Sequence, residues 1–473
     1  MSNTADSSVA SDRWVETTLG ELAEYITSGS RDWSKYYADS GSIFIRTQDI
    51  NRNRLSLNEV AFVKLPEKVE GKRSLVRKGD LLVTITGANV GKVAVVKEEI
   101  PEAYVSQSVC LVRLRDPSLA KFIHLQLTAK RGDKTAVEAM AYGLGRPVLN
   151  LENIRSAPIR VAPAKTQVVI VAEIEKQFSR LDEAVANLKR VKANLKRYKA
   201  AVLKAAVEGQ LTEDWRKQHP DVDPASKLLE RILAERRKKW SGRGKYKEPS
   251  VPEATDMASL PRGWAWATVD QLAAPEPNSI TDGPFGSNLK TEHYKETGPR
   301  VIRLQNIGDS VFVNEEAHIA EAHFSRLQKH RIFAGDLVIA ALGEAPPRSC
   351  LIPQSVGHAI VKADCIRFKP HKDIGAQYLN VVLNSQPTRQ RAKNIVHGVG
   401  RPRLNLGEIK AIVVPVPPTV EQEAIVAEVE RRLSVIEALE AAVQVNHTRA
   451  DRLRQSILAR AFSGQLACPR DVA

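Results

Sequence analysis

Apolar residues recur every three or four positions along two long stretches of the chain, with charged and polar residues between them. In the first stretch they are Ile170, Ile174, Phe178, Leu181, Val185, Leu188, Val191, Leu195, Tyr198, Val202 and Ala205. In the second they are Ile425, Val429, Leu433, Ile436, Val443, Leu453, Ile457 and Ala461. This spacing gives a helix one apolar face, and Gly209 and Gly464 stand where C-terminal caps are expected. The pattern predicts two helices of about 40 residues, each roughly 60 Å long.

A single amphipathic helix of that length cannot bury its apolar face by itself. Two arrangements would solve this problem: the two helices pair with each other, or each helix docks on the globular part that precedes it. The apolar faces extend further than the surface of a small domain requires. We therefore favour pairing within the chain and keep docking as the alternative.

Short apolar runs, separated by Gly, Pro, Asn and Asp, precede each helix. They predict strands at residues 42–47, 80–86, 92–96 and 108–114, and again at 300–304, 336–342 and 358–368. A short basic helix is predicted at 226–240. The regions before the two helices therefore have the composition of α+β globular modules.

The two modules and helices are copies of one repeat. The segment GLGRPVLNLENI begins at Gly143, and GVGRPRLNLGEI begins at Gly398, 255 positions later. The same offset holds as far as Leu211 and Leu466, whereas upstream matches have offsets between 250 and 257. Each copy thus has a part of fixed length, typical of a frame, and a part of variable length, where specificity often lies.

The charge of the chain indicates a polyanionic partner. Its 473 residues include 70 Lys and Arg against 55 Asp and Glu, a formal net charge of +15. Nucleic acid is the favoured partner and an anionic membrane surface the weaker one. No apolar run of about 18 residues is present, so no transmembrane helix is expected, and the polar N-terminus favours a cytoplasmic location. Four cysteines without a C-x-x-C pair, Cys110, Cys350, Cys365 and Cys468, are expected to be small core residues.

The motifs of common enzymes are missing from the sequence. It contains no P-loop, no G-x-G-x-x-G after a strand, no methyltransferase tetrapeptide N/D-P-P-Y/F and no H-E-x-x-H. Asp80 and Asp336 each precede a strand, but no E-x-K follows, as an acidic nuclease would require. We interpret both as structural turn residues and expect neither catalysis nor a metal site.

What remains is a set of hydrogen-bond donors suited to DNA. Arg and Lys pair with guanine edges and Asn and Gln with adenine edges, while glycine lets a loop approach phosphates closely. Arg146 and Arg401 precede the helices in a repeated G-x-G-R-P, where a hinge role is favoured over a phosphate contact. The candidate DNA-binding residues are Ser30, Arg31, Lys35, Arg46, Gln48, Lys92, Arg146, Ser287, Lys290, Arg303, Gln305, Asn306, Arg348, Lys362 and Arg401.

The junctions between module and helix carry a specific resemblance. They read VAPAKTQVVIVAEIE at 161–175 and VPVPPTVEQEAIVAEVE at 414–430. An early loop of the second module reads DGPFGSNLK at 282–290, followed by GPRVIRLQNIGD at 298–309. A module that ends in this way and occurs twice resembles the specificity subunit of type I restriction–modification systems. The first junction departs from the family pattern, because Lys165 and Thr166 precede Gln167 where acidic residues are common, which would weaken a helix cap.

The resemblance implies two α/β target recognition domains in tandem, joined by two long antiparallel helices that form an intramolecular coiled coil. The implied boundaries are 1–165 for the first recognition domain, 166–211 for the first spacer helix, 212–260 for a linker with a short basic helix, 261–417 for the second domain, 418–466 for the second spacer helix and 467–473 for a tail. Each domain would read half of a split DNA site, and the helices would set the gap.

The resemblance also implies partners. The chain would be non-catalytic and hold no cofactor. It would recruit two DNA adenine methyltransferase subunits that use S-adenosylmethionine, and restriction subunits that use ATP and Mg could join them. The alternatives are a stand-alone tandem DNA-binding regulator, which needs no enzyme partner, and a coiled-coil scaffold, whose DNA affinity would not depend steeply on salt.

Overall fold

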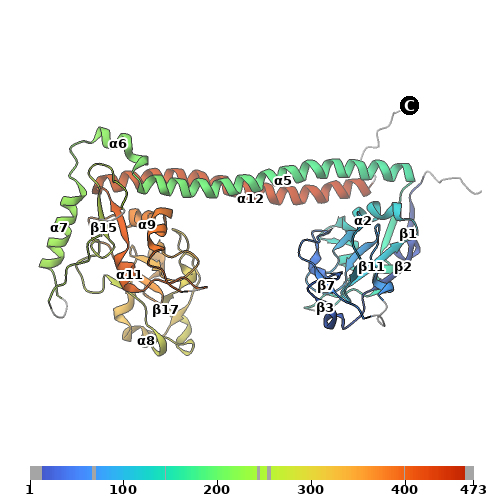
Figure 1. Cartoon of the computed structure of the whole chain (residues 1–473), viewed down its shortest axis with the longest axis horizontal. Coiled ribbons are helices and arrows are strands. Elements are labelled where there is room, and N and C mark those ends of the chain that lie inside the picture. The colour runs from blue at the N-terminus through green and yellow to red at the C-terminus, as the bar shows by residue number, and fades with distance from the viewer. Residues whose placement is uncertain are drawn as a thin grey trace, which may run out of the picture. The chain divides into compact units, whose positions relative to one another are not determined.

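The computed structural model describes residues 13–66, 71–143, 145–241, 245–252, 257–398 and 400–463. The chain forms two compact units: unit 1 is residues 1–189 with 444–473, and unit 2 is residues 190–443. Both combine strands and helices (Figure 1). The expectations for the N-terminal tail up to residue 12, for Gly464 and for Cys468 concern positions outside the described residues.

Unit 1 contains two four-stranded sheets. The first is antiparallel, in the order β2 (Ala23–Ser28), β11 (Val109–Leu114), β8 (Leu81–Thr84) and β9 (Val93–Val95). The second has the order β10 (Ala103–Val105), β4 (Ser42–Ile45), β7 (Ala61–Val63) and β3 (Tyr37–Ala38), and β10 runs parallel to β4. A pair formed by β1 (Val15–Thr18) and β14 (Pro158–Val161) leads into the first long helix. The four strands predicted here form, each slightly shorter than its apolar run.

Strand β11 lies between two cores of unit 1, because alternate side chains of a strand point to opposite faces. Cys110 and Val112 join the core that includes α2 (Ala120–Thr128). Val109 and Leu111 join the core between the two sheets. This double burial explains why the sequence of β11 is an almost unbroken apolar run.

Unit 2 repeats the antiparallel sheet of unit 1, and its second sheet again contains one parallel pair but has a different edge strand. Its antiparallel sheet has the order β16 (Ile280–Thr281), β23 (Cys365–Phe368), β20 (Leu337–Ala340) and β21 (Arg348–Leu351). Its second sheet has the order β18 (His318–Ile319), β17 (Tyr294–Ile302), β22 (Ala359–Val361) and β19 (Arg331–Ile332), with β17 and β22 parallel. The run 358–368, predicted as one strand, forms the two strands β22 and β23, which belong to different sheets.

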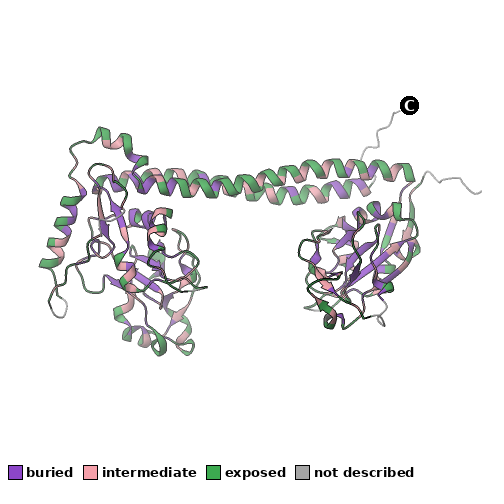
Figure 2. Ribbon diagram, viewed as in Figure 1, coloured by how far each residue is buried: buried purple, intermediate pink, exposed green. Residues whose placement is uncertain are grey.

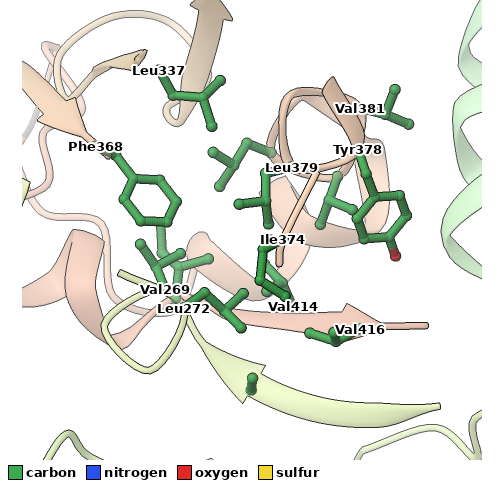
Figure 3. Packing of buried hydrophobic residues seen from close by; sticks show 14 of the residues in the cluster. Val269, Leu272, Leu337, Phe368, Ile374, Tyr378, Leu379, Val381, Val414 and Val416 are labelled. Carbon is green, nitrogen blue, oxygen red and sulfur yellow. The ribbon is translucent and has the colours of Figure 1, made fainter. Parts of the chain in front are cut away.

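The main core of unit 2 lies between its antiparallel sheet, the pair β15 (Ala265–Thr268) and β24 (Val413–Val416), and α9 (Ala376–Asn384). Figure 3 shows Phe368, Leu379 and Val414 pointing into this cluster from β23, α9 and β24. Tyr378 is fully buried, and its hydroxyl donates to the Pro415 carbonyl at 2.9 Å. Helix α6 (Glu213–Gln218) and helix α7 (Ala225–Lys238) precede β15, and α7 is the predicted basic helix.

The two predicted long helices form, as α5 (Ala164–Val207) and α12 (Thr419–Phe462), each 44 residues long. In unit 1 the beginning of α5 and the end of α12 join one core, through Ile170 and Ile174 on α5 and Ile457 and Leu458 on α12. In unit 2 the roles are reversed, and the core contains Val202, Leu203, Ala206 and Val207 of α5 with Ile425 and Val429 of α12. Both cores also contain residues of the module. Within each unit the helices therefore contact each other and also dock on the module.

The predicted apolar face is only partly buried. Val191, Tyr198 and Leu453 are each more than two-fifths exposed, so the prediction that they are covered was wrong. Two paired helices bury a narrower strip of side chains than the broad apolar face that a 3.6-residue spacing predicts. Figure 2 shows exposed residues along much of both helices. Gly209 ends α5 with a φ of 73°, as expected of a left-handed cap.

The described cysteines, Cys110, Cys350 and Cys365, are buried, as expected. Burial raises the pKa of the Cys110 and Cys350 thiols to about 12. Within the described ranges, no helix is long and apolar enough to cross a membrane.

Candidate nucleic-acid interface

A tight turn stands at the centre of the candidate site in unit 1. It comprises Ser106, Gln107 and Ser108, between β10 and β11. The Val109 N–H donates to the Ser106 carbonyl at 3.0 Å, which closes the turn. The Ser106 N–H donates to Ile45 O at 2.8 Å, and Ser108 O accepts from Ile85 N at 2.9 Å. Both sheets therefore hold this turn rigidly in place.

Gly29 brings a third segment against the same turn. Its N–H donates to Ser106 O at 3.3 Å. A Cβ on Gly29 would lie 1.9 Å from the Val105 carbonyl oxygen, so only glycine fits there. The loop that continues with Ser30 and Arg31 consequently begins beside the turn.

Unit 2 builds the same arrangement from different side chains. Its turn is Lys362, Ala363 and Asp364, between β22 and β23. The Lys362 N–H donates to Ile302 O at 2.8 Å, Cys365 N donates to Lys362 O at 3.0 Å, and Asp364 O accepts from Ala341 N at 2.9 Å. A Cβ on Gly283 would lie 2.1 Å from the Lys362 carbonyl carbon.

The repeated G-x-G-R-P segment forms a small hairpin in each unit. In unit 1, Tyr142 and Val148 exchange two backbone hydrogen bonds of 3.0 and 2.8 Å. In unit 2, His397 and Arg403 do the same at 3.1 and 2.8 Å. The next residues, Leu149 and Leu404, donate to Ile85 O and Ala341 O at 2.9 and 2.8 Å, beside the turns. The hairpins thus bring exposed Arg146 and Arg401 to the edge where the other candidate loops begin.

The sequence-predicted residues differ in how freely their side chains are presented. Eight are exposed and form the accessible part of the candidate set: Arg31, Lys35, Gln48, Arg146, Ser287, Lys290, Gln305 and Arg401. Gln48 and Gln305 occupy equivalent positions after Ile45 and Ile302. These equivalent positions support one edge in each unit at which candidate side chains are exposed.

Other predicted residues are already engaged within the protein. Arg46 forms an ion pair of 3.3 Å with Asp49 and donates to Glu59 O at 3.0 Å. Lys92 pairs with Glu138 at 3.0 Å. These ion pairs partly neutralise both positive charges, so Arg46, predicted to meet a base edge, and Lys92, predicted to meet a phosphate, are less available to DNA than the exposed candidates.

In unit 2 three predicted residues are half-buried, Arg303, Arg348 and Lys362. Lys362 Nζ lies 5.6 Å from the centroid of the Tyr294 ring. The Nε atoms of Arg303 and Arg348 are buried without a hydrogen-bond partner among the described residues. Because these two Nε atoms are buried, they are not accessible to a ligand at the surface.

Asn306 requires a correction. It is 0% exposed. Its amide donates to Val313 O at 2.9 Å and to Glu315 O at 2.7 Å, and its Oδ1 accepts from Arg303 N at 2.8 Å. With its hydrogen-bonding capacity used inside the fold, it braces a turn and does not face a base. The repeat carried the signal, because Asp49 holds the same place in unit 1 and accepts from Arg46 N at 2.7 Å.

A pocket of about 280 Å³ lies at the edge of unit 1. Its polar lining includes Ser30, Arg46 and the Ser106–Ser108 turn, and Trp33, Tyr37 and Phe44 supply an aromatic wall. Tyr37 is 48% exposed. Ser30 and Arg46 were predicted as contacts from separate loops, and the fold brings them together here.

Two exposed groups at these edges were missed by sequence reasoning, Gln107 and Arg403. Gln107 gave no signal, because it directly precedes a predicted strand. Arg403 did give one: it replaces Val148 at the same offset within an otherwise similar segment. Its guanidinium pairs with Asp364 at 2.7 Å.

Asp80 and Asp336 are structural, as interpreted from the sequence. Both are buried, and they pair with Arg113 at 2.6 Å and Arg367 at 2.7 Å. Burial raises the pKa of Asp80, against the hydrogen bond from Arg113. Among the described residues, no group of three or more His, Cys, Asp or Glu could hold a metal.

Comparisons with known proteins agree on one family. A family model described as the type I restriction modification DNA specificity domain matches residues 11–197. The EcoBI specificity subunit of Escherichia coli is 29% identical over 201 residues, which are 41% of this chain and 42% of that protein. The EcoKI specificity subunit of E. coli K12 is 22% identical over 464 residues, 95% of this chain and 88% of that one. A solved chain from a type I restriction–modification system shares the fold, with a TM-score of 0.58, 18% identity and coverage of 96% and 98%.

Proposed function

We propose that the chain is a member of the type I restriction modification DNA specificity family, whose model matches residues 11–197, and that it selects the DNA sequence on which a type I restriction–modification complex acts. The observation that carries the proposal is the pair of equivalent edges in the two units. Each edge has a turn fixed by backbone hydrogen bonds (106–108 and 362–364), a loop that a glycine brings against the turn, and the hairpin that carries Arg146 or Arg401. The three backbone hydrogen bonds that fix each turn match between the units, whereas the turn side chains differ. Two different readers on one frame suit a split, asymmetric DNA site.

We propose that residues 1–165 and 261–417 are the target recognition domains, that 166–211 and 418–466 are spacer helices in an antiparallel coiled coil, and that 212–260 is the linker. The proposal is supported within each unit, where the beginning of one helix packs with the end of the other. Equal helix lengths of 44 residues also suit a common spacer. The exposed donors, with Arg303, Arg348 and Lys362, would contact DNA.

The proposed partners are two DNA adenine methyltransferase subunits, joined in restriction complexes by restriction subunits. Support comes from a groove of about 570 Å³ in unit 1, between α5 and α12. Val168, Val169 and Leu453 in its lining are exposed by 70%, 39% and 49%, with Glu173, Lys176 and Arg460 beside them. An apolar strip with charged borders suits a partner helix. The chain itself is non-catalytic, so S-adenosylmethionine, ATP and Mg would bind to the partners.

The proposal is tested by mapping N6-methyladenine in host DNA with and without this gene. We expect methylation at one bipartite motif to disappear when the gene is removed and to return on complementation. An unchanged methylation map, with the methyltransferase partner present, would instead favour the stand-alone DNA-binding regulator.

The spacer role has its own test. Inserting one helical turn, about four residues, at matched positions of both α5 and α12 should lengthen the gap of the methylated motif and leave both half-sites unchanged. The matched control inserts four residues after Val251, which is 71% exposed in the linker, and should leave the gap unchanged. A constant gap in the helix variant would rule out the spacer role.

A further inference from the structure

We propose that the base-reading groups sit at the clamped turn of each unit: Gln107 reads an adenine in one half-site, and Arg403, held by Asp364, reads a guanine in the other. This inference rests on the proposed function and assigns the specificity-determining side chains within it.

Gln107 has the geometry of a reader. It is exposed at the centre of a turn whose backbone is fixed by hydrogen bonds to Ile45, Ile85 and Val109. It lines the same pocket as Ser30 and Arg46. No described residue forms a hydrogen bond with its side-chain amide. A free carboxamide on a rigid turn can donate and accept together, as the N7 and N6 groups of adenine require.

Arg403 meets the same requirement in unit 2. Its Nη2 lies 2.7 Å from Asp364 Oδ1, and its guanidinium lies 5.9 Å from the centroid of the Phe285 ring. Backbone hydrogen bonds with His397 fix its main chain. The side chain is still 46% exposed. A guanidinium held on one side keeps its other N–H groups for the O6 and N7 acceptors of guanine.

The difference between the turns is what favours a specificity role over a structural one. Asp364 lies in the turn itself and forms an ion pair with Arg403, whereas the equivalent residues of unit 1 are Ser108 and Val148. Three backbone hydrogen bonds around each turn are matched between the units. In contrast, the Arg46 side chain is only 26% exposed and donates to both Asp49 and the Glu59 carbonyl, and Asn306 is buried. The two turns therefore share a backbone arrangement and differ in their side chains, as expected of two sites that recognise different bases.

The test uses the full chain with its methyltransferase partners and maps methylated motifs for single variants. Gln107→Ala should make one A·T position of one half-site degenerate, with discrimination reduced roughly tenfold to a hundredfold. Arg403→Ala should do the same at a G·C position of the other half-site, and Asp364→Asn should weaken that position less. Each variant should leave the opposite half-site unchanged.

Two matched controls accompany these variants. Gln218→Ala changes an exposed glutamine on α6, and Arg231→Ala changes an exposed arginine that also pairs with an aspartate, Asp373, at 3.3 Å. Both should keep the wild-type motif. Gln107→Glu keeps the size of the side chain while replacing its donor with acceptors, so it should shift the preference toward cytosine, whose N4 donates.

The outcomes separate this inference from the proposed function. A wild-type complex that methylates no bipartite motif would overturn the proposed function itself. A wild-type bipartite motif that stays unchanged in folded Gln107→Ala and Arg403→Ala complexes would overturn only the assignment of these readers. Thermal unfolding of each complex distinguishes lost reading from lost folding, and Gln107→Glu provides a second, isosteric variant.

Discussion

The two long helices begin alike but are anchored differently. The side-chain amides of Gln167 and Gln422 donate to the carbonyls of Ala162 and Pro417 at 2.6 and 3.0 Å, so both copies close the helix entry in the same way. One residue earlier, α12 has Glu421 and α5 has Thr166. Glu421 is 1% exposed, whereas Thr166 is half-buried.

Glu421 accepts hydrogen bonds from three side chains of unit 2. Thr212 Oγ1 donates to it at 2.7 Å, Arg216 Nη1 at 2.6 Å and Trp264 Nε1 at 2.9 Å. In unit 1 the tryptophan at the equivalent place, Trp14, lies under the guanidinium of Arg160 at 5.1 Å instead. A buried carboxylate therefore anchors the start of α12 alone.

Unit 1 places its carboxylate further along the helix. Asp182 of α5 accepts from Arg54 of the module at 2.7 Å and also pairs with Arg454 of α12. The equivalent residue of α12, Glu437, forms no ion pair among the described residues. The two copies therefore share the same helices, but the carboxylate that joins the helix to the module stands at a different position in each copy.

The largest expected effect is on Glu421. Glu421→Ala leaves Arg216 and Trp264 without their shared acceptor, so we expect the free energy of unfolding to fall by about 3 kcal/mol. Urea unfolding followed by tryptophan fluorescence measures it. The matched control, Thr166→Ala, should cost about 0.5 kcal/mol or less. Equal losses in both variants would show that the two helix starts are anchored alike.

A smaller effect is expected at Asp182. Burial acts to raise its pKa, but the hydrogen bond from Arg54 and the charge of Arg454 lower it overall. Because Asp182 is 42% exposed, water screens the pairs, and Asp182→Asn should cost only about 1 kcal/mol. This stabilisation is present above the unfolded pKa and is lost as the pH falls through the lower folded value.

Unfolding curves of the Asp182→Asn variant at pH 7 and at pH 3 check this prediction. The difference from wild type should be larger at pH 7. Glu437→Gln is the control at the equivalent position of α12, and it should change stability at neither pH. A similar loss in the control would contradict the difference in anchoring.

Sequence alone predicted the repeated frame, because helical periodicity and a constant offset are local patterns. It also revealed that Thr166 departs from the acidic pattern. It did not reveal that the start of α12 is anchored by hydrogen bonds to Glu421, because the donors Thr212, Arg216 and Trp264 lie far from Glu421 along the chain. The prediction of one strand over 358–368 missed a turn inside this run. There the chain turns at Asp364, whose φ is 65°, and only tertiary pairing with two sheets reveals that turn.

The smallest expected effect concerns an equivalent position in the third turn of each helix, Glu428 of α12 and Glu173 of α5. The hydrogen bonds from Arg431 and, after the opposing effect of burial, from Arg432 lower the pKa of Glu428 to about 2. Glu173, the equivalent residue of α5, has its pKa lowered chiefly by the hydrogen bond from Gln177. A depressed folded pKa stabilises above the unfolded value near 4.5 and loses that stabilisation as the pH falls toward 2. Glu428→Gln should therefore cost about 0.5 kcal/mol at pH 7, since surface pairs are screened, and progressively less below pH 4.5. The free energies of unfolding of Glu428→Gln and of the matched variant Glu173→Gln are measured from pH 7 down to pH 3. A cost of Glu428→Gln that stayed constant with pH would contradict this prediction.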